Sequence, residues 1–329
     1  MFSNKFFHGR ALAALFGALG LLVSSLHAQE VFPARPVNMV IPYPPGGLSD
    51  GIARSIAPSL ERMLKQPVVL MNRGGAGGAI GAASVAKAEP NGYTIMFTLS
   101  GITTLTEQAL VTNQTPLFTL NQFKPLARIS TDRLAIIVKG DSKFKTLNEL
   151  IAAARAEPDK ISYASSGNYG TVHVPIEMFA EDAKIKLRHI PYNGGGPILT
   201  AILGSQVDFT MLPVSSIATM VDSGKMRILA VVGKDVFPQY PNAPTTAAAG
   251  LSFDYLPWTG IFAPADTPPE VLKKLRSSLR AAVDDPQFLA ALAKRGGNIA
   301  YLDAPEFEPF LAREVTILTK VIRRLGKLE

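Results

Sequence analysis

The amino-acid sequence predicts an α/β protein of two domains. From residue 36 onward, short apolar runs alternate with segments whose apolar residues recur at helical spacing. Strands that alternate with helices of ten or more residues favour parallel sheets built from right-handed crossovers. The chain has 329 residues, more than one ordinary domain. It contains no cysteine, so packed cores must stabilise the fold without disulfides or thiolate metal sites.

The first 28 residues have the pattern of a secretory signal peptide. Lys5 and Arg10 precede an apolar stretch, residues 11–23, that is too short to span a bilayer comfortably, and Ala28 supplies a small residue for cleavage. Cleavage there leaves 301 residues and lowers the formal net charge from +7 to +5. The remaining basic residues are scattered. They therefore indicate a mild attraction for anions and no nucleic-acid binding. No later apolar run reaches membrane-spanning length.

The N-terminal part begins with a strand, "VNMVIPY", followed by a helix over residues 50–64. Ile52, Ile56 and Leu60 recur in that helix at the spacing of one buried face. Two more strands, "PVVLMN" and "YTIMFTL", flank the helical segment "GAIGAASVAKA" and the turn "EPNG".

The same alternation continues to the C-terminus. "RLAIIVK", "KISYA", "KLRHIPY" and "QVDFTM" are predicted strands, and "TLNELIAAARAE" is a predicted helix. Further helices are expected from about Thr171 and after Gly196. Three helices are expected between Pro268 and Arg324, one of them starting at "DAPEFEPF". Trp258, the only tryptophan, is expected in the core or at a hinge.

Three strand–helix corners share one pattern: an apolar run, a tyrosine, and a cluster of small residues before a helix. They are "IPYPPGG" (41–47), "ISYASSG" (161–167) and "IPYNGGG" (190–196). Glycine lets a backbone approach a ligand closely, and the first N–H groups of a helix lack intrahelical partners. Such corners lie at the carboxyl ends of strands, where open α/β sheets bind ligands. Tight turns of any α/β protein would share much of this pattern, so the corners predict a carboxylate site without excluding simple turns.

Five stretches together identify a family. "PARPVNMVIPYPPGGLSDGIAR", "LKQPVVLMNRGGAGGAIGAASVAKAEPNGYTIMF", "ISYASSGNYGTVHVPIEMF", "HIPYNGGGPILTAILGSQVDFTM" and "WTGIFAPADTPPEVLKKL" resemble, in order and spacing, the Bug family. Its members are the substrate-binding receptors of tripartite tricarboxylate transporters. The resemblance runs from about Arg35 to the C-terminus. The chain departs from the family at Met71, Ala201 and Ala248, where acidic residues are usual, and none of these lies in the three corners.

The resemblance implies a two-lobed periplasmic binding protein, or Venus flytrap, in which each lobe is a mainly parallel sheet flanked by helices. Residues 1–28 are then the signal peptide. Residues 29–127 together with 255–329 form lobe 1, and residues 128–254 form lobe 2. The hinge consists of crossing strands near residues 123–130 and 253–263.

The resemblance also implies which residues bind the ligand. They lie in loops of both lobes: Tyr43, Pro45, Gly46, Gly47, Ser100, Thr103, Ser165, Ser166, Gly167, Gly170, Thr171, His173, Tyr192, Asn193, Gly194 and Gly195. Asp50 is expected to cap its helix and brace the loop, because a bound anion would repel it. His173 has an alternative role, a hydrogen bond to a loop carbonyl that fixes the rim of lobe 2. Whether Tyr192 touches the ligand is left open.

The function implied is an extracytoplasmic solute-binding receptor, located in the periplasm. It would be a monomer that captures a small carboxylate (a di- or tricarboxylate, an amino acid or an aromatic acid) for a tripartite tricarboxylate-type permease. No cofactor, metal or nucleic acid is expected. An alternative is a sensor component that presents its ligand to a membrane signalling partner.

Catalysis is the second alternative, and the motifs speak against it. "GGAGGAIG" suggests dinucleotide binding, but Ile80 occupies the third glycine position and the acidic residue about twenty positions on is missing. No glycine–any–serine–any–glycine elbow occurs, and only His173 and His189 follow the signal peptide as histidine bases. The sequence therefore predicts a binding protein and no enzyme.

Overall fold

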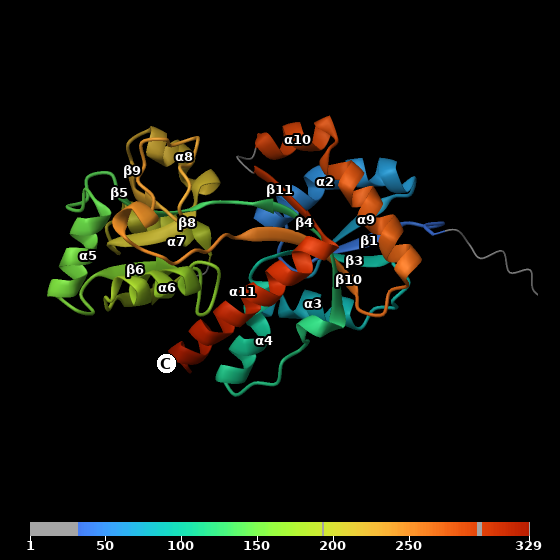
Figure 1. Cartoon of the computed structure of the whole chain (residues 1–329), viewed down its shortest axis with the longest axis horizontal. Helices are drawn as coiled ribbons and strands as arrows, with labels where there is room; N and C mark the ends of the chain where they lie inside the picture. The colour runs from blue at the N-terminus through green and yellow to red at the C-terminus, as the bar shows by residue number, and fades with distance from the viewer. Residues whose placement is uncertain (1–31, 193, 295–297, 329) are drawn as a thin grey trace, which may run out of the picture.

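The computed structural model describes residues 32–192, 194–294 and 298–328, and the strands form two sheets. The expected signal peptide lies outside the described residues. Figure 1 shows the two sheets side by side with helices around each. The strands of the first sheet are β1 (Val37–Ile41), β2 (Val68–Asn72), β3 (Thr94–Leu99), β4 (Phe123–Thr131), β10 (Trp258–Pro264) and β11 (Asn298–Asp303). The strands of the second sheet are β5 (Leu134–Lys139), β6 (Ser162–Ser165), β7 (Arg188–Pro191), β8 (Phe209–Pro213) and β9 (Met226–Val231).

The first sheet has the order β11-β4-β10-β3-β1-β2 and a packed core on each face. Successive residues of β1 enter different cores, because neighbouring side chains of a strand point to opposite faces: Met39 lies in one core and Val40 in the other. The helices of the Met39 core are α2 (Leu48–Leu64), α9 (Pro269–Val283) and α10 (Pro286–Ala293). The helices of the Val40 core are α3 (Ala79–Ala86), α4 (Ile102–Val111) and α11 (Ala304–Leu325).

The second sheet has the order β7-β6-β8-β5-β9. Its apolar core includes residues of β5, β6, β8 and β9 that are almost fully buried, such as Ile136 and Phe209. Helices α5 (Leu147–Ala156), α6 (His173–Ala183), α7 (Gly195–Leu203) and α8 (Val214–Asp222) contribute to this core, and so does the end of α11.

The two-lobed α/β arrangement is confirmed, but both sheets are mixed and not mainly parallel. Strand β1 pairs in parallel with β2 and β3, and β6 pairs in parallel with β7 and β8. The antiparallel pairs involve β4, β5, β10 and β11. The reason is the crossing between sheets. The chain leaves the first sheet through β4 and returns through β10, so these neighbours run in opposite directions.

Helix α11 reaches from one sheet to the other. Near its start, Phe307 is buried in the core of the first sheet, whereas Leu318, Val321 and Ile322 belong to the core of the second. The last turns of this helix therefore pack with the second sheet, although the expected boundary gave residues 255–329 to the first lobe. Within the described ranges, no helix combines the length and the apolar character that crossing a membrane requires.

Candidate functional site

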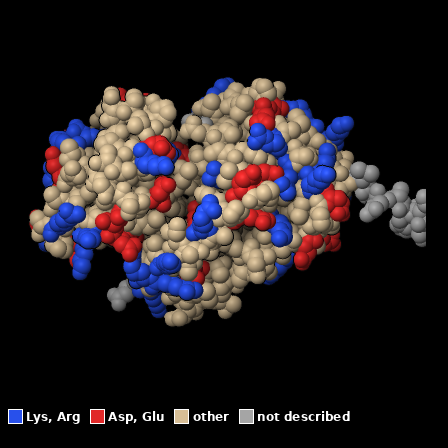
Figure 2. Space-filling model, in the orientation of Figure 1, with Lys and Arg blue, Asp and Glu red and all other residues tan. Residues whose placement is uncertain are grey.

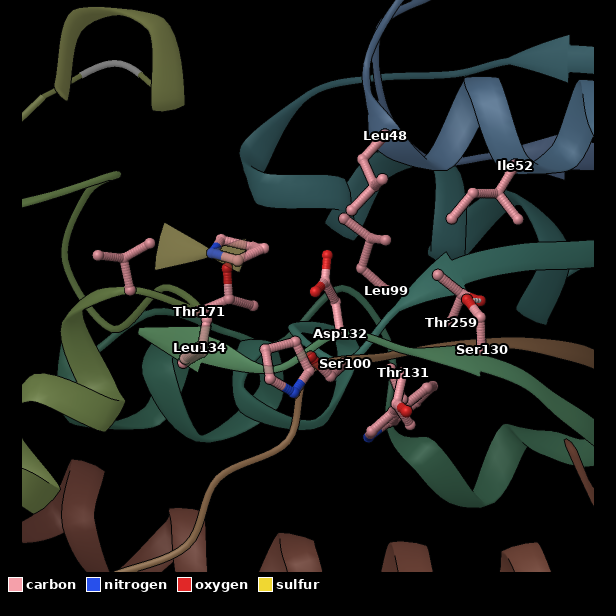
Figure 3. A pocket seen from close by; sticks show the side chains of 14 residues that line it. Leu48, Ile52, Leu99, Ser100, Ser130, Thr131, Asp132, Leu134, Thr171 and Thr259 are labelled. Atoms are coloured by element: carbon pink, nitrogen blue, oxygen red, sulfur yellow. Dashed lines mark hydrogen bonds between the residues drawn. The ribbon is translucent and has the colours of Figure 1, made fainter. Parts of the chain in front are cut away.

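A cavity lies where the chain passes between the two sheets (Figure 3). Its free space, counted out to the solvent at its open mouth, amounts to about 580 Å³. Fourteen residues line it: eight are apolar, five carry a hydroxyl group, and one is an aspartate. Neither lysine nor arginine is among the described residues of this lining. In Figure 2, the notch between the two halves at the top of the view is bordered mainly by uncharged residues.

Three helices from both halves begin at this cavity. Leu48 is the first residue of α2, and Ser100 and Thr171 lie two residues before the starts of α4 and α6. None of the three has a side-chain cap, whereas side chains cap α5, α10 and α11. The first backbone N–H groups of α2 and α6 can meet an anion, and at α4 those of Gly101 and Ile102 can, because Thr103 and Thr104 already donate to Ser100 O and Gly101 O (3.1 Å each). Helix α9 is also uncapped, so a missing cap permits a ligand without requiring one.

The proline–glycine corner is held by Asp50. Its Oδ2 accepts hydrogen bonds from Gly46 N–H (2.9 Å) and Arg54 Nε (2.9 Å), and its Oδ1 accepts one from Asn72 Nδ2 (3.0 Å). The Arg54 hydrogen bond, chiefly, lowers the pKa of Asp50 to about 2. Asp50 therefore braces the loop as expected, but it does so through Gly46. The residue at the cap position of α2 is Gly47, which receives no side-chain hydrogen bond.

The remaining residues of this corner differ in their solvent exposure. Pro45, Gly46 and Gly47 are exposed, which leaves their backbone accessible. Tyr43 is half-buried, and its hydroxyl oxygen lies 3.4 Å from Thr98 Oγ1. None of these four residues lines the cavity, although Leu48 directly after them does.

The serine–glycine corner uses its buried side chains internally. Ser165 is fully buried; its hydroxyl lies 2.6 Å from His189 Nε2 and accepts a hydrogen bond from Gly167 N–H (3.2 Å). His173 is 1% exposed, and its Nδ1 accepts a hydrogen bond from Tyr169 N–H (2.9 Å). The structure thus places His173 as a brace of this loop, though its partner is an N–H group and not the expected carbonyl. Burial, chiefly, lowers the pKa of His173 to about 3, so the imidazole is neutral at physiological pH.

The other expected residues of this corner lie nearer the surface. Ser166, Gly167, Gly170 and Thr171 are partly exposed, and Thr171 lines the cavity. The corner therefore presents its backbone and the Thr171 side chain, while the side chains of Ser165 and His173 are turned to the interior.

The tyrosine–glycine corner stands apart from the cavity lining. Tyr192 is half-buried and packs against the core of the second sheet, and its N–H donates to Ser165 O (2.8 Å). Gly194 caps α7 without a side-chain hydrogen bond, and Gly195 is exposed with open space around it. Asn193 lies outside the described residues. No described residue of the three corners (41–47, 161–167 and 190–196) lines the cavity itself. Leu48, directly after the first corner, and Thr171, four residues after the second, do line it, whereas the third corner has no such neighbour.

Ser100 and Thr103 are both buried at the start of α4, but only Ser100 lines the cavity. Ser100 lines the cavity, and its hydroxyl lies 3.4 Å from that of Tyr255. Thr103 is 2% exposed and donates to Ser100 O (2.8 Å), so it supports the helix start from behind.

Behind the cavity wall, Trp258 is held by a buried carboxyl group. The indole N–H lies 2.9 Å from both carboxyl oxygens of Glu314 in α11. Burial, chiefly, raises the pKa of Glu314 to about 8. Trp258 is 1% exposed and is the first residue of the returning strand β10, which agrees with its expected role in the core or hinge.

Asp132 is a lining residue that the sequence analysis did not single out. It follows β4 directly, on the first crossing between the sheets. The Ser215 hydroxyl donates to its Oδ2, while its Oδ1 is buried without a hydrogen-bond partner. Burial, chiefly, raises the pKa of Asp132 to about 6. The signal available in the sequence was an acidic residue between the predicted crossing strand near 123–130 and the next predicted strand, "RLAIIVK". Burial of a charge at such a place costs free energy unless a partner compensates it.

The model of one family, the tripartite tricarboxylate transporter family receptor, matches residues 52–327. The chain belongs to this family. One relative is described as the UPF0065 protein in the tcbD-tcbE intergenic region of Pseudomonas sp. strain P51. It is 36% identical to this receptor, and the match covers 87% of the receptor and 85% of the relative.

Solved structures agree with this assignment. The periplasmic binding protein BugD matches 90% of the receptor and 99% of its own chain, with a TM-score of 0.74 and 32% identity. Two Rhodopseudomonas palustris proteins contain ligands. MatC with bound malate has a TM-score of 0.74 and 25% identity, covering 88% of the receptor and all of its own chain. The second, a protein with adipate, has a TM-score of 0.75 and 26% identity, and the match covers 89% of the receptor and 97% of its own chain.

The chemistry available in the cavity of this receptor is that of binding. Hydroxyl groups, free helix N–H groups and apolar side chains can orient a small acid. Within the described part of the chain, no group of three or more His, Cys, Asp or Glu residues is placed to hold a metal ion.

Proposed function

We propose that this receptor captures a small organic carboxylate between its two lobes and presents it to the membrane subunits of a tripartite tricarboxylate-type permease. Family membership supports the receptor role, and the structural neighbours that hold malate and adipate support the carboxylate class. The proposal places the receptor in the periplasm as a monomer without catalytic activity. Residues 1–28 are removed as a signal peptide.

One observation carries the proposal: uncapped helix starts from both halves meet at one cavity that has hydroxyl groups but no basic residue in its described lining. An anion there gains charge-assisted hydrogen bonds of roughly 1.5–3 kcal/mol each. Three or four of them suffice for micromolar binding. The expected ligand-binding residues of all three corners are retained in the proposal, with those that reach the cavity, Ser100 and Thr171, in direct contact.

The lobes are proposed to follow the two sheets, with the hinge in the segments near 123–130 and 253–263. A ligand that touches both lobes only in the closed form favours that form by its differential affinity. Helix α11 contributes to the cores on both sides of this hinge.

Isothermal titration with an acid and its amide tests the anion model. A thermal-shift screen of small acids first identifies a tight-binding acid, since ligand binding raises the melting temperature. The amide is then expected to bind at least tenfold more weakly, because it lacks the charge that the helix N–H groups stabilise. Equal affinities of acid and amide contradict the model.

Substitution of the corner glycines tests the site itself. Gly47 has φ −79°, and a Cβ atom placed on it would lie 3.8 Å from Pro44 O, so Gly47→Val fits the fold. We expect Gly47→Val and Gly195→Val to weaken binding of the identified acid about tenfold or more, because the side chain covers the N–H groups. Ala152→Val, on the exposed face of α5, is the matched control. Wild-type affinity in both glycine variants rules out the glycine-corner site.

A further inference from the structure

The carboxylate of Asp132 is the one acidic group among the described residues that line the cavity. It projects into the space between Thr171 of the second half and Leu99 of the first (Figure 3). A site that accepts only anionic groups would not place a carboxylate there, since like charges repel across a cavity of low dielectric constant.

The carboxylate of Asp132 faces the Ser215 hydroxyl and the backbone N–H groups of Ser215 and Arg133, yet its Oδ1 has no hydrogen-bond partner. The side chain reaches the start of α8, where the Ser215 hydroxyl donates to Oδ2. Its backbone N–H donates to Pro257 O (3.1 Å). The buried Oδ1 has no partner, one of two such side-chain atoms in the described residues, the other being Tyr301 Oη.

The nearest basic side chain in sequence does not supply the missing partner. Arg133 donates to Val232 O (3.2 Å) and to Asp235 Oδ2 (3.1 Å), and it is absent from the cavity lining. The side chain of Arg133 therefore leaves Asp132 Oδ1 without a donor, and a ligand bound in the cavity that Asp132 lines can supply one. The negative charge also occupies the N-terminus of α8, so the anionic end of a ligand is left to α2, α4 and α6.

The rest of the lining indicates what lies between these two ends. Leu48, Ile52 and Leu99 from the first half, with Leu134 and Val172 from the second, give the cavity an apolar middle. Leu48 is 44% exposed although it is a large apolar residue, so part of its surface is available to a ligand.

Resting on the proposed carboxylate site, we propose that the ligand is zwitterionic: a carboxylate at the helix starts, an apolar body, and a cationic nitrogen that donates to Asp132. In a desolvated cavity, a hydrogen bond between the Asp132 carboxylate and a cationic nitrogen is stronger than one between neutral groups. Asp132 therefore favours a zwitterion strongly over plain acids and dicarboxylates. Asp132 is then a specificity-determining residue of this receptor.

Two matched sets of probes test the proposal by isothermal titration at neutral pH. The aliphatic set is δ-aminovalerate, δ-hydroxyvalerate, valerate and adipate. The aromatic set is para-aminomethylbenzoate, para-hydroxymethylbenzoate, para-toluate and terephthalate. In at least one set, the amino acid is expected to bind roughly 10- to 100-fold more tightly than every other member. The proposal is overturned when, in every set that binds, a dicarboxylate, hydroxy acid or plain acid binds as tightly as its amino counterpart.

Substitution of Asp132 provides the second arm. Asp132→Asn keeps the shape and can still accept from Ser215, and it is expected to lower amino-acid affinity at least tenfold while raising that of the dicarboxylate. Asp235→Asn, which removes an equal charge at a 64% exposed side chain, is the control and should bind as wild type. Circular dichroism establishes that each variant is folded. Unchanged amino-acid affinity in folded Asp132→Asn contradicts the proposal, and if the variant does not fold, the wild-type series decides.

The two levels of the proposal fail differently. If plain acids or dicarboxylates bind best, the proposed carboxylate site stands and the proposal of a zwitterionic ligand is refuted. If the two sets and the wider acid screen all give no binding, the carboxylate site itself is refuted, and the zwitterion with it.

Discussion

At the residue scale, Glu314 shows how a carboxyl group removed from water can fix a cavity wall. Its oxygens accept from the Trp258 indole, and Arg128 exerts a favourable but weaker electrostatic effect. Burial dominates and favours the neutral acid. Because the pKa of about 8 in the folded protein exceeds the ordinary value of 4.5, the folded state holds a proton that the unfolded chain has already released at neutral pH.

This difference predicts a pH dependence of stability. The contribution of Glu314 is fully present below about pH 4.5 and is lost as the pH rises through about 8. Glu314→Gln, which stays neutral, should flatten the decline of the unfolding free energy between pH 6 and pH 8, a difference of roughly 1–3 kcal/mol. Urea denaturation at several pH values measures it. Parallel pH profiles in wild type and variant would contradict the assignment of a raised pKa.

At the element scale, α11 is a single helix that contributes to two cores. Phe307 packs against Trp258 with ring centroids 5.1 Å apart, while Leu318 lies in the core of the second sheet at 1% exposure. Arg323 near its end pairs with Glu107 of α4 (2.6 Å). The helix therefore ties the second sheet to the first independently of the crossing strands.

Truncation of the buried face of α11 should be costly. Leu318→Ala is expected to lower the free energy of unfolding by about 2–5 kcal/mol, because it removes buried methyl groups and leaves a cavity. The neighbouring Ile317, which is 50% exposed, provides the matched control, and Ile317→Ala should change stability by only about 0.5 kcal/mol. Equal effects of the two substitutions in urea denaturation would show that the last turns of α11 do not support the second core.

At the scale of the whole molecule, the two halves meet closely beside the cavity. A Cβ atom placed on Gly101, at the start of α4, would lie 3.4 Å from Thr171 Cγ2 before α6. A Cβ atom would thus just touch Thr171, and only a side chain longer than that of alanine would press against it at this point, where the helix starts of both halves converge.

This contact gives a test of closure. The acid identified by the thermal-shift screen should reduce the radius of gyration of the wild-type receptor in small-angle X-ray scattering, because binding to both lobes favours the closed form. Gly101→Leu should hold the lobes apart, abolish that reduction and weaken binding about tenfold or more. Ala152→Leu on the exposed face of α5 is the control. If the ligand compacts Gly101→Leu as much as wild type, the contact between residue 101 and Thr171 does not control closure.

Local patterns in the sequence predicted much of the fold. The alternation of strands and helices, the glycine clusters and the family resemblance depend on residues close in sequence or on whole motifs, and the family model and solved structures confirm the two-lobed receptor. Helix α4 was missed: its threonines are weak helix formers, and burial of Ile102, Thr103 and Glu107 stabilises it instead. Strand β9 was likewise not expected.

The sequence by itself determined the α/β class, the family and the glycine-bearing corners, because periodicity and backbone freedom are properties of short segments. Only the tertiary structure decided which corners lie beside the cavity, that Ser165 and His173 are turned inward, and that Asp132 is left with an unpaired oxygen. The partner of Asp132, Ser215, lies 83 residues away in sequence. Burial and pairing at that separation arise from packing, which no local pattern records.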